Sequence, residues 1–206
     1  MRLEGMREEQ RRISGMVLVE DRLPKRIRTI GGFDIGYSGK KAKVVGVVLD
    51  YGSLEMVEKK VIETSVGFPY IPTFLSFREG PPIVKVYEKL KRKPDVLMLN
   101  GQGIAHPLGV GLASHVGVLL GKPSVGVAQN RLIGEYQEPR GVNDFERLMF
   151  RGEQVGWVLR SKENCKPIFV SPGHCVSLKR SLSICMYCVR GRRLPEPLAF
   201  AHEFTK

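Results

Sequence analysis

The spacing of hydrophobic and polar positions changes twice along the chain. Residues 3–19 carry apolar side chains at helical spacing with charged side chains between them, which predicts an amphipathic helix. Between about residues 28 and 65 the chain is rich in apolar and β-branched residues. Asp50 to Ser53 interrupt this segment with the residue types of a hairpin turn. We therefore expect three consecutive antiparallel strands in this part of the chain.

In the middle of the chain the apolar residues return to helical spacing, and the expected helices and strands then alternate. The pattern predicts two helices and two short apolar strands: helix 81–92, strand 95–100, helix 110–120 and strand 123–129. Further mixed structure follows residue 150. The order βββ-α-β-α-β predicts an α/β fold with a central mixed sheet and helices on its faces. No repeat or linker divides the chain, so we expect residues 1–206 to form a single domain.

Charge narrows the class of partner. The 206 residues include 33 Lys and Arg against 21 Asp and Glu, which gives a formal net charge of +12. Such an excess favours a polyanionic partner, most simply nucleic acid. No apolar run approaches the ~18 residues of a membrane span, and the N-terminus lacks the apolar core of a signal peptide. We therefore expect a cytoplasmic protein with no membrane contact.

The four cysteines all lie near the C-terminus, at positions 165, 175, 185 and 188. Cys185 and Cys188 form a CxxC pair, and four thiolates are able to hold zinc. The pair lies within SLSICMYCVRG, however, which has the pattern of an amphipathic helix. Cysteine packs in such a helix as a small apolar residue. We favour core packing by reduced thiols and keep the zinc site as the alternative.

Three residues that carry side-chain oxygens stand at the ends or centres of predicted elements. Asp34 lies within the apolar segment GGFDIGY, Glu79 lies where the next helix is expected to start, and Asn100 ends the strand DVLMLN. Carboxylates gathered from separate elements commonly hold Mg²⁺ against a phosphodiester, because hard cations prefer oxygen ligands. The alternative is that Asp34 is a turn residue and Glu79 an acid at a helix N-terminus.

The segment PYIPTFLSFREG (69–80) is stiffened by prolines and rich in aromatic residues. Tyr70 stands at its tip, in a position to stack on bases or wedge between them. The alternative is a surface loop whose aromatic residues pack on the core.

Of the histidines, His106 lies in a glycine- and proline-rich loop and His202 near the C-terminus, while His115 has a packed helical position and His174 a turn before a helix. Basic residues gather at 89–93 and 179–193, as phosphate contacts or as solvated helix faces.

Five collinear segments resemble the endonuclease V family: GGFDIGY, PYIPTFLSFREGP, DVLMLNGQGIAHPLGVGLASHVGVLLGKPSVGVAQ, PIFVSPGHCVSL and RRLPEPLAFAH. The resemblance extends from about residue 5 to 204. It implies an RNase H-like fold and recognition of hypoxanthine, which is deaminated adenine, in DNA or RNA. It also implies cleavage of the second phosphodiester bond 3′ to the lesion with Mg²⁺ or Mn²⁺, and we expect a monomer.

The resemblance also implies roles for individual residues. Asp34 and Glu79 match metal-binding acids, and Asn100 falls where the family has its other metal-binding aspartate. His106 and His202 match histidines near the scissile phosphate.

The remaining matches concern the base. Tyr70 matches the wedge residue that fills the gap left by a flipped base. Leu75, Gly101 and Leu112 match residues that line the base pocket.

Four positions depart from the family pattern. Asn100 replaces an aspartate and Gln129 replaces a lysine of the catalytic site, while Thr73 replaces a glycine and Leu108 an arginine. A neutral amide at position 100 removes one negative charge from the metal site and weakens Mg²⁺ binding. An engineered trap or a natural relative that binds without cutting explains this better than compensation by nearby groups. A non-cleaving inosine-binding protein is therefore the alternative function, and a nucleic-acid chaperone indifferent to inosine is a weaker one.

Overall fold

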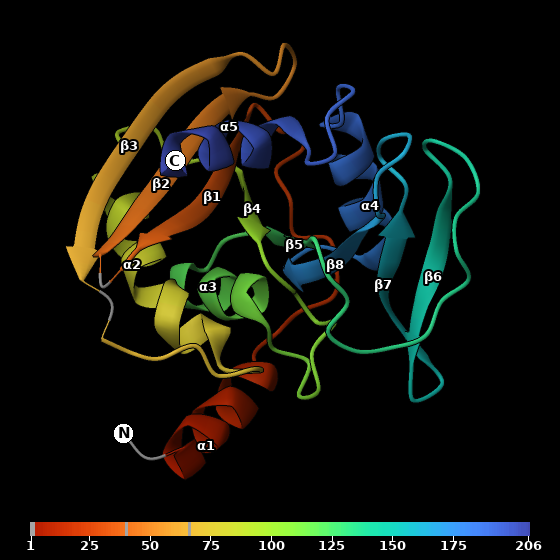
Figure 1. Ribbon diagram of the computed structural model, residues 1–206, viewed down its shortest axis with the longest axis horizontal. Coiled ribbons are helices and arrows are strands. Elements are labelled where there is room, and N and C mark those ends of the chain that lie inside the picture. The colour runs from red at the N-terminus through yellow and green to blue at the C-terminus, as the bar shows by residue number, and fades with distance from the viewer. Residues whose placement is uncertain (1–2, 40, 66) are drawn as a thin grey trace.

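The computed structural model describes residues 3–39, 41–65 and 67–206, and one eight-stranded sheet runs through it (Figure 1). The strand order is β3-β2-β1-β4-β5-β8-β7-β6. The first three strands are β1 (Thr29–Ser38), β2 (Lys41–Asp50) and β3 (Met56–Ser65), paired antiparallel. The prediction of three consecutive antiparallel strands is confirmed.

The centre of the sheet is parallel. Strand β4 (Val96–Asn100) pairs in parallel with β1, and β5 (Ser124–Ala128) pairs in parallel with β4. Helices α2 (Leu75–Lys89) and α3 (Leu112–Leu120) precede these two strands. The predicted βββ-α-β-α-β order is therefore the order observed.

The remainder of the chain completes the sheet and covers it. Strands β6 (Phe145–Phe150), β7 (Glu153–Leu159) and β8 (Ile168–His174) extend it antiparallel. The other helices are α1 (Leu3–Ser14), α4 (Leu178–Tyr187) and α5 (Glu196–Thr205).

The two faces of the sheet are buried against different helices, as the alternation along β4 shows. Val96 and Met98 point into a core shared with α4 and α5, while Leu97 and Leu99 point into a core shared with α2 and α3. This period of two places every side chain of a central strand under a helix. Asn100, the last residue of β4, is the first that both cores leave partly exposed.

Helix α5 lies directly against β1 (Figure 1). A Cβ atom on Gly32 would stand 1.9 Å from the carbonyl oxygen of Pro197, so only glycine permits this approach. The close contact brings His202, in the second half of α5, to the middle of β1.

Three predicted boundaries are wrong. Helix α2 begins at Leu75 rather than at Pro81, because burial of Ser76 and Gly80 continues the helix through both prolines. Helix α1 ends at Ser14 rather than near residue 19, where Gly15 follows it. His174 does not lie in a turn but ends β8, and the next helix starts after the capping hydroxyl of Ser177.

The cysteines are free thiols, and all except Cys165 are buried. Within the residues described, no group of three or more His, Cys, Asp or Glu side chains is arranged to hold a metal ion. The zinc alternative is therefore not supported. None of the helices in the described residues has the length and apolar character to cross a membrane.

Candidate functional site

Asp34 is the centre of a polar cluster at the open end of the parallel strands. Its carboxylate is buried, with 7% of the residue exposed. Asn100 donates a hydrogen bond from Nδ2 to Oδ1 of Asp34 at 2.9 Å, and Nδ1 of His202 lies 2.8 Å from Oδ2. These three residues, from β1, β4 and α5, form what we call the Asp34 cluster. Both oxygens of the central carboxylate are therefore already engaged.

Glu79 approaches the same region from α2. Tyr37, on β1 beyond Asp34, donates its hydroxyl to Oε1 of Glu79 at 2.9 Å. Burial, together with the negative charge of Asp34, raises the pKa of Glu79 to about 7 in spite of that hydrogen bond. The guanidinium of Arg78 lies 4.3 Å from the centre of the Tyr37 ring. Glu79 thus changes charge near neutral pH, under the influence of Asp34.

The donors near Asp34 fit a divalent cation only in part. The oxygen donors are the carboxylates of Asp34 and Glu79 and the amide oxygen of Asn100. The amide presents its nitrogen to Asp34, and nitrogen-bound hydrogens repel a cation. No group of three or more His, Cys, Asp or Glu side chains is arranged to hold a metal ion among the described residues, so the encoded set does not fit a complete divalent metal site.

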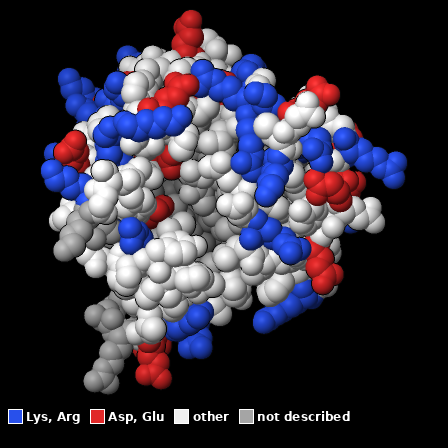
Figure 2. Space-filling view, viewed as in Figure 1, with Lys and Arg blue, Asp and Glu red and all other residues white. Residues whose placement is uncertain are grey.

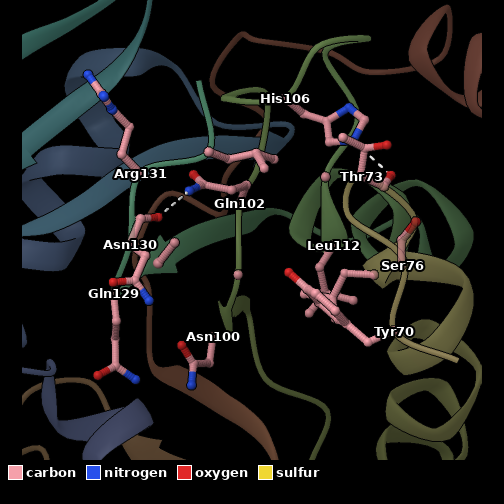
Figure 3. A pocket seen from close by; sticks show the side chains of 15 residues that line it. Tyr70, Thr73, Ser76, Asn100, Gln102, His106, Leu112, Gln129, Asn130 and Arg131 are labelled. Atoms are coloured by element: carbon pink, nitrogen blue, oxygen red, sulfur yellow. Dashed lines mark hydrogen bonds between the residues drawn. The ribbon is translucent and has the colours of Figure 1, made fainter. Parts of the chain in front are cut away.

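A cavity of about 280 Å³ opens beside the cluster (Figure 3). It is close to the lower limit of ligand pockets, ~300 Å³. Seven predicted site residues line it: Tyr70, Leu75, Asn100, Gly101, His106, Leu112 and Gln129. The loop before α2 and the ends of β4 and β5 thus bring together residues that are far apart in sequence.

The absence of a side chain at Gly101 lets Leu112 pack closely against it in the lining of the cavity. A Cβ atom on it would lie 3.1 Å from both Cβ and Cδ2 of Leu112, closer than ordinary packing allows. Tyr70 also borders the cavity, with 65% of its surface exposed. An aromatic ring this exposed contributes little to the core and is free to meet a ligand.

Thr73 anchors the Tyr70 loop (residues 68–74) from below. Its carbonyl oxygen accepts hydrogen bonds from Nε2 of Gln10 at 2.6 Å and from Nε2 of His106 at 2.9 Å. The backbone N–H of Leu108 donates to Nδ1 of His106, so the ring hydrogen is on Nε2. Burial lowers the pKa of His106, which keeps the ring neutral. The hydrogen bond from Nε2 of His106 therefore holds the Tyr70 loop, while Nδ1 binds the backbone of its own loop, and neither bond reaches the Asp34 cluster.

Gln129 is hydrogen-bonded to Arg193, a contact that the sequence did not predict. Arg193 donates from Nη1 to Oε1 of Gln129 at 3.2 Å and from Nη2 to its carbonyl oxygen at 2.8 Å. Its Nε donates to the carbonyl oxygen of Lys166 at 2.9 Å. The sequence placed Arg193 only in a basic run. Its guanidinium supports the wall of the cavity instead of standing free for phosphate.

Lys and Arg side chains lie on several sides of a hollow, largely uncharged centre in Figure 2, with a few acidic side chains inside it. This view shares its direction with Figure 1, in which the carboxyl ends of the central strands occupy the middle. A polyanion at this face would meet attractive charge at the rim of the hollow.

The fold and the Asp34 cluster define an α/β protein of RNase H-like type with a carboxylate at the centre of its sheet. The model of the endonuclease V family matches residues 11–203. The chain belongs to this family.

Relatives and solved structures agree with the family. Endonuclease V of Dictyoglomus turgidum is 46% identical over 198 residues, which cover 96% of this chain and 86% of the relative. The crystal structure of Bacillus subtilis endonuclease V superposes with a TM-score of 0.94 at 29% identity and covers all of this chain and 91% of that one. A variant of Ciona intestinalis endonuclease V, in complex with DNA containing an inosine, has a TM-score of 0.88 at 27% identity, over 98% of this chain and 95% of that one.

Proposed function

We propose that this protein recognises inosine in DNA or RNA and is built to cleave the second phosphodiester bond 3′ to it. The observation that carries the proposal is the cavity edged by Tyr70, which opens directly beside the Asp34 cluster. A flipped base in this cavity places its backbone near the cluster. The family and the inosine-containing complex of a relative support the same substrate.

Recognition requires that the base leave its stack. The exposed ring of Tyr70 is suited to fill the resulting gap, because base–aromatic stacking contributes about 1–3 kcal/mol and tolerates any neighbouring base. Leu75 and Leu112 supply apolar walls to the cavity, while Gly101 leaves its backbone accessible. Gln129 stands on the wall where we predict a contact with the phosphate, and Arg193 fixes its position. The whole site lies in one chain, and we propose that a monomer acts.

Cleavage is expected to be weak in the chain as encoded. Asp34 holds His202 in position, and Glu79, whose pKa burial raises to about 7, is suited to carry a proton. We propose Mg²⁺, or Mn²⁺, as the cofactor of the reaction, and Asn100 as the residue that impairs its binding. His106 remains a predicted site residue, and its contacts assign it to loop support.

A protein that binds inosine without cutting is the second candidate. It is favoured by the hydrogen bond from Asn100 to Asp34, which satisfies the buried carboxylate without any cation. Both candidates require selective binding, so binding is the experiment that tests them together. Affinity is measured for two single strands that differ only in one inosine or adenosine, as DNA and as RNA. We expect preference for inosine, and equal affinity for both strands would contradict both candidates.

A further inference from the structure

Asn100 is the residue of this chain that is chemically most exposed to deamidation. The chain contains four asparagines, at positions 100, 130, 143 and 164, and only Asn100 is followed by glycine. A backbone nitrogen attacks the side-chain carbonyl of the preceding asparagine most readily when its own residue has no side chain. Heat accelerates this loss of the amide, which makes asparagine a thermolabile residue.

We propose that Asn100–Gly101 is a self-modification site, and that conversion of Asn100 to aspartate completes the metal site and switches on cleavage. This proposal rests on the proposed function. The new aspartate would supply the carboxylate that the oxygen donors near Asp34 lack.

The reaction needs only water. The nitrogen of Gly101 bonds to Cγ of Asn100, the bond from Cγ to Nδ2 breaks, and the amide leaves as ammonia with the proton of the Gly101 N–H. Water then opens the five-membered imide: its hydroxyl adds to Cγ and its proton returns to the nitrogen of Gly101. The chain gains aspartate at position 100, and the net change is one water consumed and one ammonia released.

The position of the amide explains why the product matters. Nδ2 of Asn100 lies 2.9 Å from Oδ1 of Asp34, so replacing this nitrogen by oxygen sets two carboxylates in contact. Two carboxylates at this separation do not both ionise unless a proton or a cation lies between them. With His202 against the other oxygen of Asp34, the modified cluster holds two carboxylates and an imidazole, which are donors that a divalent cation accepts.

The fold limits the rate at which Asn100 loses its amide. The N–H of Gly101 donates to the carbonyl oxygens of Leu99 at 2.9 Å and Val127 at 3.1 Å, and it must release both before it can attack. The end of β4 must therefore open locally, and such openings become more frequent with temperature. We expect the unmodified form to persist in the cold and to convert on heating. Opening of the imide at its other carbonyl would give isoaspartate, which routes the chain through the side chain, and peptide mapping distinguishes the two products.

The experiment follows one preparation of the whole protein during incubation at raised temperature. Peptide mapping by mass spectrometry measures aspartate and isoaspartate at position 100, and the peptides with Asn130, Asn143 and Asn164 serve as internal controls. Cleavage of an inosine strand and the shift in melting temperature caused by Mn²⁺ are measured on the same samples. We expect aspartate to form first at position 100, with cleavage and the Mn²⁺ shift rising in proportion.

Two variants keep the outcomes separate. Asn100→Gln cannot form the five-membered ring readily, so heating should change neither its mass nor its cleavage. Asn100→Asp should cut from the start. An unmodified Asn100 after incubation, or aspartate without gain in cleavage or Mn²⁺ response, overturns the switch and leaves the proposed function standing. Failure of Asn100→Asp to cut overturns the proposed function itself, whatever the mass spectra show.

Discussion

Asp34 illustrates how single residues set the chemistry of this protein. A buried carboxylate needs partners, and Asn100 and His202 each supply one to a different oxygen. The sequence predicted that these residues matter, because a carboxylate within an apolar strand is expensive to bury. It did not predict that the amide of Asn100 faces Asp34, since that orientation depends on the parallel pairing of β1 and β4. Tyr37 and Arg193 were missed because only the fold places them against Glu79 and Gln129.

Replacement of Tyr70 by alanine tests the predicted wedge. The side chain is 65% exposed, so its loss should leave the free energy of unfolding nearly unchanged. The preference for inosine should fall about 5- to 150-fold, since one stacking contact contributes ~1–3 kcal/mol. Competition binding on matched strands measures the change. Phe145→Ala, on β6 and 43% exposed, is the control and should keep the preference; equal losses in both variants would refute the role of Tyr70.

His115 predicts part of the dependence of stability on pH. Burial lowers its pKa to about 4, below the ordinary value of 6.5. The unfolded chain therefore takes up a proton between these pH values while the folded chain does not, and stability is lost as the pH falls through this window. Burial lowers the pKa of His106 and His174 in the same direction. In urea titrations, His115→Gln should lose less stability than the parent between pH 7 and pH 5; an equal loss would contradict the assignment.

At the scale of elements, the middle of β1 meets the end of β4 through their parallel pairing, and α5 joins them because it packs closely on β1 (Figure 1). The strands and their order were predictable from period and turn residues. The start of α2 was not predictable in this way. Pro81 and Pro82 are typical of the first turn of a helix, but burial of its residues in the fold lets α2 begin earlier, at Leu75. That error placed Glu79 at the first turn of the helix, whereas it lies further along the helix facing Tyr37.

Gly32→Ala tests the packing of α5. The new Cβ would meet the carbonyl oxygen of Pro197 at 1.9 Å, so α5 must shift and His202 must leave Asp34. We expect a loss of roughly 2–4 kcal/mol in the free energy of unfolding, measured by urea denaturation. Gly67→Ala is the matched control, because nothing lies within 4 Å of its Cβ position. Unchanged stability in Gly32→Ala would show that α5 does not hold this position.

At the scale of the whole molecule, charge and shape act together. The net charge of +12 favours nucleic acids in general, and we propose that the cavity selects among them. Composition alone predicted the first property and left the chemical identity of the ligand open. The family resemblance supplied that identity, and the cavity lined by residues from distant parts of the chain supports it.

The dependence of binding on salt concentration separates attraction by charge from selection of the base. Each released counterion weakens binding, with a slope of about −0.7 per phosphate contact on a single strand in a plot of log K against log salt concentration. Strands with inosine and with adenosine should therefore weaken in parallel, and the ratio of their affinities should persist. Fluorescence anisotropy at several salt concentrations measures both. A ratio of one throughout would reduce the protein to a charge-driven binder.

The most direct measurement is single-turnover cleavage of a labelled strand with one inosine, with Mg²⁺ and with Mn²⁺, by freshly prepared protein and by Asn100→Asp. We predict that both bind the strand and that Asn100→Asp cuts one nucleotide beyond the inosine at least about 100-fold faster, because a missing carboxylate costs orders of magnitude in rate. Equal, rapid cleavage by the unmodified chain would contradict the assignment of Asn100 as the residue that disables the site.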